Sequence, residues 1–121
     1  MSFKSRFITL RDNYVRGQVA DLNIPPFPAA PAVRLRYRFS GRVQHVGFRL
    51  AVCELAARLG LTGWCQNLES GDVLAELQGT EDRIRFLVDF LRSRRRIKIR
   101  NMEVTPLAVL PDETGFMKKD G

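Results

Sequence analysis

From residue 33 onward the chain alternates between two hydrophobic periods, and this alternation constrains the fold more than any other feature of the sequence. Apolar residues stand at every second position of residues 33–39, which is the pattern of a half-buried strand. They recur at helical spacing over Phe48–Leu59 and again over residues 84–91. Gly60, which follows the first of these helical segments, is a typical helix terminator. The sequence therefore predicts a domain in which strands and helices alternate along the chain.

Further strand segments complete the predicted order of elements. They are Thr62–Asn67, residues 73–77, a strand between residues 97 and 110, and a short edge strand at residues 115–118. Thr80 is expected to cap the second helix with its hydroxyl. The resulting βαββαβ order predicts an α+β fold, a ferredoxin-like sandwich in which two helices cover one face of an antiparallel sheet.

Residues 1–32 differ in character from the rest of the chain. Four prolines fall within residues 24–31, and a segment so rich in proline forms a stiff, extended linker. Before it, apolar residues recur at helical spacing among basic ones, at positions Phe3, Phe7, Leu10 and Tyr14. Three roles fit this amphipathic segment: a targeting sequence, a helix on a membrane surface, or an arm docked on the domain. We expect a flexible or loosely docked N-terminal extension (residues 1–32), followed by one domain over residues 33–121.

The net charge indicates the class of partner, and the cysteines indicate the cellular location. Twenty Lys and Arg residues against 13 Asp and Glu give a net charge of +7. This excess favours an anionic partner: nucleic acid, an acidic lipid surface or a phosphorylated small molecule. No apolar run approaches the roughly 20 residues of a membrane span. The two cysteines, Cys53 and Cys65, are too few for a zinc site, and without a secretory signal we expect reduced thiols and a cytoplasmic location.

The connection between the first predicted strand and the first predicted helix is the most informative segment for function. A helix N-terminus leaves backbone N–H groups without partners and attracts anions, and a tight loop before it adds further donors. Gly41 and Gly47 permit the backbone conformations of such a loop. Arg49, in the first turn of the helix, is placed to hold a phosphate group with two parallel hydrogen bonds. The segment therefore fits a phosphate-binding site.

Two segments resemble the signatures of the acylphosphatase family. Residues 41–49, with the sequence GRVQHVGFR, match the pattern G-x-V-Q-G/H-V-x-F/M-R. Residues 63–79, with the sequence GWCQNLESGDVLAELQG, match the second pattern, G-aromatic-small-x-N-x-x-x-G-x-V-x-x-x-x-x-G. The resemblance extends over residues 33–119 and leaves out the N-terminal extension.

This resemblance implies an enzyme that needs no metal or cofactor and hydrolyses small acyl phosphates to a carboxylate and inorganic phosphate, its product and inhibitor. It also implies that Arg49 binds the phosphate and that Asn67 positions the attacking water. The implied phosphate-binding loop consists of seven consecutive residues: Gly41, Arg42, Val43, Gln44, His45, Val46 and Gly47. His45 departs from the glycine that is commoner at its position, and its Cβ is expected to crowd the loop.

A second hypothesis is a nucleic-acid-binding module with the same ferredoxin-like fold. It depends on a basic cluster near the end of the second predicted helix, made of Arg92, Arg94, Arg95, Arg96, Lys98 and Arg100. Single-stranded RNA-binding domains of this fold carry stacking aromatic residues on the third strand, whereas residues 73–77 contain none. A domain cut from a larger carbamoyl-transfer enzyme is a third hypothesis, which the short chain disfavours. The sequence thus predicts an acyl phosphate as the partner, rather than nucleic acid or a membrane.

Overall fold

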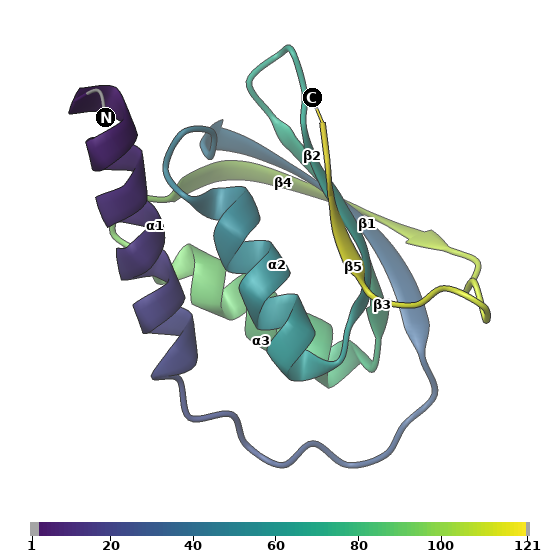
Figure 1. The fold of residues 1–121 in the computed structure, drawn as a ribbon. Coiled ribbons are helices and arrows are strands. Elements are labelled where there is room, and N and C mark those ends of the chain that lie inside the picture. The colour runs from purple at the N-terminus through teal and green to yellow at the C-terminus, as the bar shows by residue number, and fades with distance from the viewer. Residues whose placement is uncertain (1–2, 121) are drawn as a thin grey trace.

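The computed structural model describes residues 3–120, and Figure 1 shows that their strands form one sheet with helices beside it. In chain order, the elements are α1 (Phe3–Ala20), β1 (Val33–Arg42), α2 (Phe48–Leu59), β2 (Thr62–Asn67), β3 (Val73–Gly79), α3 (Glu81–Arg92), β4 (Lys98–Leu107) and β5 (Phe116–Lys119). From β1 to β4 this is the predicted βαββαβ order, and α2 and α3 lie on the same face of the sheet. The prediction of a ferredoxin-like α+β fold is confirmed.

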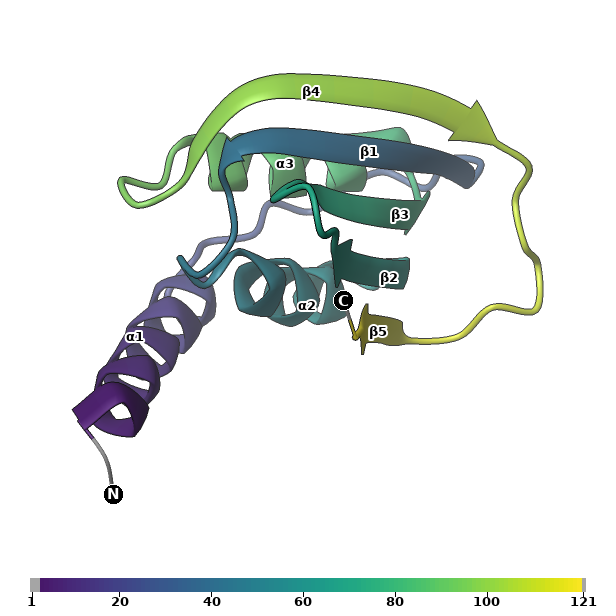
Figure 2. The same cartoon turned by 90° about the horizontal axis from the view of Figure 1, so that it is seen from above.

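The last strand corrects the prediction of a wholly antiparallel sheet. The strand order is β4-β1-β3-β2-β5, and β5 pairs with β2 in parallel, whereas the other pairs are antiparallel. Figure 2 shows the chain leaving β4 at one edge and crossing the end of the sheet over residues 108–115. It enters the opposite edge at the end where β2 begins, so β5 runs in the same direction as β2.

A buried ionic cluster fixes the path of this crossing connection. Arg34 of β1 is only 2% exposed, and it donates to Glu76 at 2.9 Å and to the two carboxylate oxygens of Glu113 at 2.7 and 3.0 Å. Gln78 accepts from the same guanidinium at 3.0 Å and donates to the Leu110 carbonyl oxygen at 2.9 Å. The hydrogen bond from Arg34 lowers the pKa of Glu113, which keeps this carboxylate charged at neutral pH. The connection is therefore held against the sheet before β5 begins.

Aromatic packing in the core fixes the point at which α2 begins. Phe39 of β1 and Phe48, the first residue of α2, are buried and pack edge to face with their ring centroids 5.0 Å apart. Val52 and Leu55 continue the buried stripe of α2 at helical spacing. Because Phe48 is anchored in the core, the N-terminus of α2 and the loop before it have a defined position.

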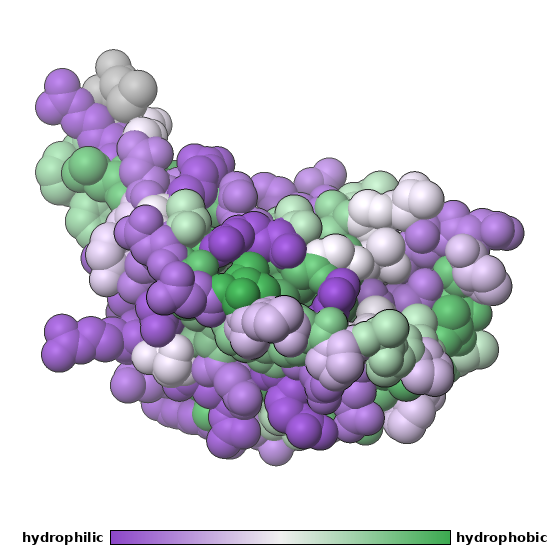
Figure 3. Space-filling model, turned by 90° about the horizontal axis from the view of Figure 1, so that it is seen from below, coloured by the Kyte–Doolittle hydropathy of each residue, from purple (hydrophilic) through white to green (hydrophobic). Residues whose placement is uncertain are grey.

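Helix α1 packs against the domain through a face other than the one the sequence indicated. Its buried residues are Val15 and Val19, which lie one turn apart. The Arg58 guanidinium of α2 donates to the carbonyl oxygen of Val19 at 2.6 Å, near the end of α1. The apolar positions that recur at helical spacing are instead exposed: Phe3, Phe7, Leu10 and Tyr14. Figure 3 shows the resulting mixture of hydrophobic and hydrophilic side chains at the end of the molecule that carries α1, at the upper left.

The segment after α1 also contacts the domain. The Phe27 ring packs edge to face on Phe86 of α3, with centroids 5.8 Å apart. No helix within residues 3–120 is long and apolar enough to cross a membrane. The mobility of residues 1–32 in solution, and with it the division at residue 33, stays a prediction.

Candidate active site

The loop between β1 and α2, residues 43–47, leaves its backbone N–H groups available to a ligand. Within the described part of the chain, none of these N–H groups donates to a protein acceptor. The first turn of α2 follows directly, and the N–H groups of a first turn have no acceptor within their own helix. Such a set of donors, at the positive end of a helix, is suited to bind phosphate oxygens.

Positive φ angles give this loop its shape. Gly41 (φ 122°), His45 (φ 61°) and Gly47 (φ 82°) adopt a backbone region that favours glycine. His45 is the one residue other than glycine that does so within residues 3–120. A Cβ atom at Gly41 would lie 2.1 Å from the carbonyl oxygen of Lys98, so β4 packs directly against the start of the loop. Only glycine fits at that position.

Three side chains of the loop hold it on the domain. Val43 and Val46 are buried in the core. Gln44 donates through Nε2 to the carbonyl oxygens of Leu68 and Asp72, at 2.7 and 2.9 Å. Both acceptors belong to the connection between β2 and β3, so the loop and the end of β2 are fixed relative to each other.

Arg49 lines a cavity of about 320 Å³ beside this loop. Its Nη1 donates to the carbonyl oxygen of Lys119 at 3.1 Å, so β5 helps to position the guanidinium. Among the ion pairs within residues 3–120, none involves Arg49, and its positive charge is therefore available to an anion. Lys118 of β5 lines the same cavity and adds a second cation.

Asn67, the last residue of β2, lines this cavity as well. Its Oδ1 atom is buried and has no hydrogen-bond partner among the described residues. A buried carbonyl oxygen without a partner is costly, and such atoms in native proteins commonly serve a bound water or ligand. The Asn67 amide is thus an available acceptor in the wall of the cavity that holds Arg49.

The candidate residues from the sequence divide into two groups by position. Those that line the cavity with Arg49 and Asn67 are Val43, His45 and Gly47. The other four candidates do not line it: Gly41 and Arg42 belong to β1, Gln44 reaches the connection after β2, and Val46 lines a neighbouring cavity. The first group is in a position to contact a ligand directly, and the second shapes the loop.

The sequence analysis missed a wall of this cavity that α1 supplies. Arg11, Asp12 and Arg16 all line it, and Arg11 is hydrogen-bonded to the adjacent Asp12 at 3.0 and 3.1 Å. A Cβ atom at Gly47 would lie 2.8 Å from Cγ2 of Val15, so α1 rests directly on the loop. The signal was the spacing of Val15 and Val19, one helical turn apart, which the stronger pattern of apolar residues at positions 3–14 obscured.

Comparison with known proteins assigns the family. The acylphosphatase family model matches residues 35–118. The chain belongs to the acylphosphatase family. It is 39% identical to the acylphosphatase of Clostridium beijerinckii over 80 aligned residues. The alignment covers 65% of this chain and 89% of that protein. Alignments with the acylphosphatases of Synechococcus and Bordetella avium span 46% and 55% of those proteins.

Solved acylphosphatase structures share the fold described above. The crystal structure of acylphosphatase from Bacillus subtilis matches with a TM-score of 0.66 and 28% identity, over 72% of this chain and 98% of that one. The acylphosphatase from Coxiella burnetii matches with a TM-score of 0.66 and 31% identity, over 73% of this chain and 93% of that one. In each case about a quarter of this chain lies outside the structural match, and the match to the family model begins after α1.

Cys53 also lines the cavity, but its thiol is poorly suited to act as a nucleophile. Burial raises the pKa of Cys53 above its usual value, although the Lys118 and Arg49 charges oppose this shift. The thiol is therefore protonated at neutral pH, whereas the reactive form of a cysteine is the thiolate. The cysteine is therefore not a candidate nucleophile of this cavity.

We expect His45→Gly to leave kcat/KM for an acyl phosphate within about threefold of the parent, because the change removes a strained backbone at little entropic cost. The φ angle of 61° is one that glycine adopts freely. Steady-state kinetics with benzoyl phosphate and a thermal melt measure the two effects. A loss of activity of tenfold or more in a variant that melts like the parent would show that the imidazole contacts the substrate.

Proposed function

We propose that this chain hydrolyses small acyl phosphates to a carboxylate and inorganic phosphate, by in-line attack of a bound water on phosphorus. The observation that carries the proposal is the convergence of three groups on one cavity in an acylphosphatase fold. These groups are the Arg49 guanidinium, the N–H groups of the loop and Oδ1 of Asn67, and the last two have no hydrogen-bond partner within residues 3–120. Each has a distinct task in the reaction.

The chemistry of the substrate explains why so few groups are sufficient. An acyl phosphate is a mixed anhydride, and its leaving group is a carboxylate whose conjugate acid has a pKa of about 4. Such a group departs as a stable anion, so a general acid contributes little. What remains is to hold the phosphoryl group, neutralise the charge on its oxygens and align a water.

Arg49 and the loop perform the first two tasks in this proposal. Backbone N–H groups aimed at one point bind the phosphoryl oxygens without reorganising during the reaction, which is the basis of electrostatic catalysis. The planar guanidinium of Arg49 adds two parallel hydrogen bonds and a full positive charge. Lys118 strengthens the local positive potential from the facing strand.

Asn67 performs the third task. Its Oδ1 accepts a hydrogen bond from the attacking water and so orients an oxygen lone pair toward phosphorus. The amide is neutral, so it does not repel the anionic substrate as a carboxylate would. The proton of the water passes to solvent or to the phosphate product, and no covalent intermediate forms on the chain.

One assay tests the proposal together with its independence from metal. Purified chain should release inorganic phosphate from benzoyl phosphate at the same rate with and without EDTA, because Arg49 and the loop supply the positive charge that a metal would otherwise provide. In water labelled with oxygen-18, the label should enter phosphate. Activity that EDTA removes and magnesium restores would contradict metal independence, and label found in benzoate would contradict attack at phosphorus.

The nucleic-acid-binding alternative is not favoured. On the open face of the sheet, three of the four arginines of β1 are paired with carboxylates at 2.7–2.9 Å: Arg34 with Glu76 and Glu113, Arg36 with Glu76, and Arg38 with Asp72. Residues 73–79 of β3 contain no aromatic side chain on which a base could stack. A face whose arginines are mostly paired with carboxylates, and whose β3 strand carries no aromatic residue, is a poor surface for single-stranded RNA.

Product inhibition and location complete the proposal. Inorganic phosphate, as the product, is bound by the same loop and Arg49, and it therefore competes with the substrate. The cytoplasmic location expected from the sequence belongs to this proposal and is supported by two free thiols, Cys53 and Cys65.

A further inference from the structure

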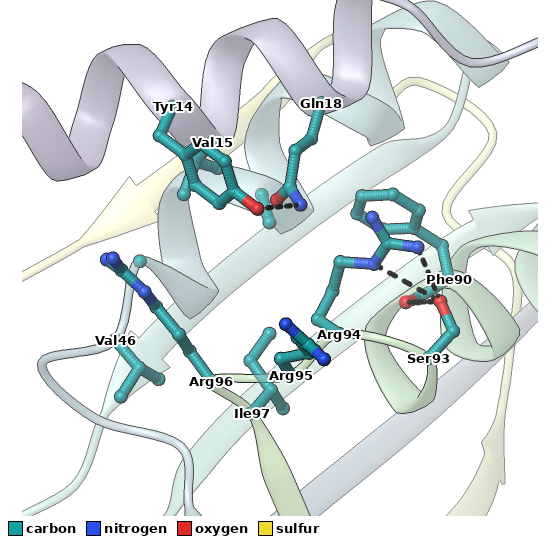
Figure 4. Close-up of a pocket in the computed structure, with 12 residues that line it drawn as sticks. Tyr14, Val15, Gln18, Val46, Phe90, Ser93, Arg94, Arg95, Arg96 and Ile97 are labelled. Atoms are coloured by element: carbon teal, nitrogen blue, oxygen red, sulfur yellow. Dashed lines mark hydrogen bonds between the residues drawn. The ribbon is translucent and has the colours of Figure 1, made fainter.

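A second cavity lies between α1 and the connection from α3 to β4. Its volume is about 390 Å³, which is larger than that of the candidate catalytic cavity. Figure 4 shows Tyr14 and Gln18 of α1 facing the side chains of three consecutive arginines, Arg94, Arg95 and Arg96. No part of the proposed reaction uses this cavity, so its chemistry needs its own account.

The three arginines form a site of uncompensated positive charge. Within residues 3–120, none of them takes part in an ion pair, in contrast to Arg34, Arg36 and Arg38 of β1. Two of them are held by aromatic rings: Arg94 stacks over Phe90 at 4.3 Å from the ring centroid, and Arg96 lies over Tyr14 at 5.4 Å. Arg94 also donates through Nε and Nη2 to Ser93 Oγ at 3.2 and 2.9 Å. Because a guanidinium that packs by its face on a ring keeps its N–H groups at the edge, Arg96 and the remaining N–H groups of Arg94 can still face an anion.

Much of the remaining cavity wall is apolar, although Tyr14, Gln18 and Ser93 also line it. Buried side chains from three helices and two connections line it, namely Val15, Val46, Ala51, Phe90 and Ile97. An inorganic anion would satisfy the arginines but leave this apolar wall against water. An extended polymer would not fit a cavity of this size that α1 walls on one side. The combination suits a small molecule with an anionic end and an apolar end.

We propose that this cavity binds a small organic phosphate, in which an apolar ring or chain is joined to a phosphate group. The phosphate lies among Arg94, Arg95 and Arg96, because guanidinium groups match phosphate oxygens with paired hydrogen bonds. The apolar part packs on Val15, Val46 and Ile97. The ligand thereby bridges α1 and the domain, and it lies next to Gly47, which borders both cavities. This inference does not depend on the proposed hydrolysis.

Binding of 1-naphthylphosphonate tests the inference, because its phosphorus–carbon bond resists hydrolysis. Calorimetric titration of the full chain should give binding at least about tenfold tighter than that of methylphosphonate, which lacks the ring, or of naphthalene-1-methanol, which lacks the charge. Equal affinity for 1-naphthylphosphonate and methylphosphonate would mean that charge alone is recognised, and it would overturn the proposal.

Matched variants locate the bound probe. The pair Arg94→Gln with Arg96→Gln should weaken binding by about tenfold or more, whereas Arg92→Gln with Arg100→Gln, which removes the same charge outside this cavity, should change it less than about twofold. Thermal melts check that both pairs fold. The binding should survive Arg49→Ala, which disables the loop site. If Arg49→Ala removes the binding and the two arginine pairs behave alike, the probe occupies the loop, and the second site is wrong whatever the outcome for hydrolysis.

Discussion

Arg49→Ala is expected to lower kcat/KM for benzoyl phosphate by about 10²–10³-fold, the size of effect that follows the loss of one charge-stabilising donor from an active site. Arg49 contacts phosphate before and during the reaction, so KM should rise and kcat should fall. Inhibition by inorganic phosphate should weaken in parallel, because the product uses the same guanidinium. Initial rates over a range of substrate and phosphate concentrations measure all three quantities.

Two further variants separate the geometry of Arg49 from its charge. Arg49→Lys keeps the charge but loses the planar fork and its five donors, so we expect it to recover little of the activity. Arg85→Ala is the matched control, since Arg85 is exposed on α3 and pairs with Glu81 away from the cavity. Circular dichroism confirms folding of each variant. Near-normal kcat and phosphate affinity in a folded Arg49→Ala variant would remove the basis for assigning this site.

Local patterns predicted the elements of the domain well, because each is encoded within its own segment. The alternation in residues 33–39 and the helical stripe of Phe48–Leu59 give β1 and α2 directly. The parallel direction of β5 depends instead on a connection held by Arg34 and Glu113, which lie 79 residues apart. Thr80 precedes α3 as expected, but its buried hydroxyl has no partner within residues 3–120 and makes no capping bond, so that prediction is wrong. Periodicity reports none of these tertiary contacts.

The site residues were predicted from family motifs, whereas the fold was predicted from hydrophobic periodicity. Spacing alone left Arg49 one basic residue among twenty, and only the family motifs singled out Arg49 and Asn67. The structure brings these two residues to one cavity, although they lie on different elements. The contribution of α1 lies outside the motifs, because Arg11 and Arg16 reach the cavity only through the packing of Val15 on Gly47. A residue that acts through such a contact leaves no local pattern.

Asn67→Ala is expected to lower kcat by about 10²-fold while inhibition by inorganic phosphate stays within about twofold of the parent. The reason is that Oδ1 of Asn67 serves the attacking water rather than the phosphoryl group, so its loss acts only once the water must be aligned. KM should change little, in contrast to Arg49→Ala. The same steady-state and inhibition measurements on both variants provide the comparison.

The neighbouring residue supplies a matched amide control for this experiment. Gln66 lies one position earlier on β2 and donates through Nε2 to the carbonyl oxygen of Asp120 at 2.7 Å, outside the cavity. Gln66→Ala removes an amide from the same strand and should therefore leave kcat near the parent value. If Asn67→Ala lost phosphate binding and kept its turnover, the amide would be holding phosphate rather than water. If Asn67→Ala and Gln66→Ala lowered kcat equally, the cause would be a disturbance of β2. A role specific to the Asn67 amide requires that only Asn67→Ala lowers kcat, because the two changes are otherwise alike.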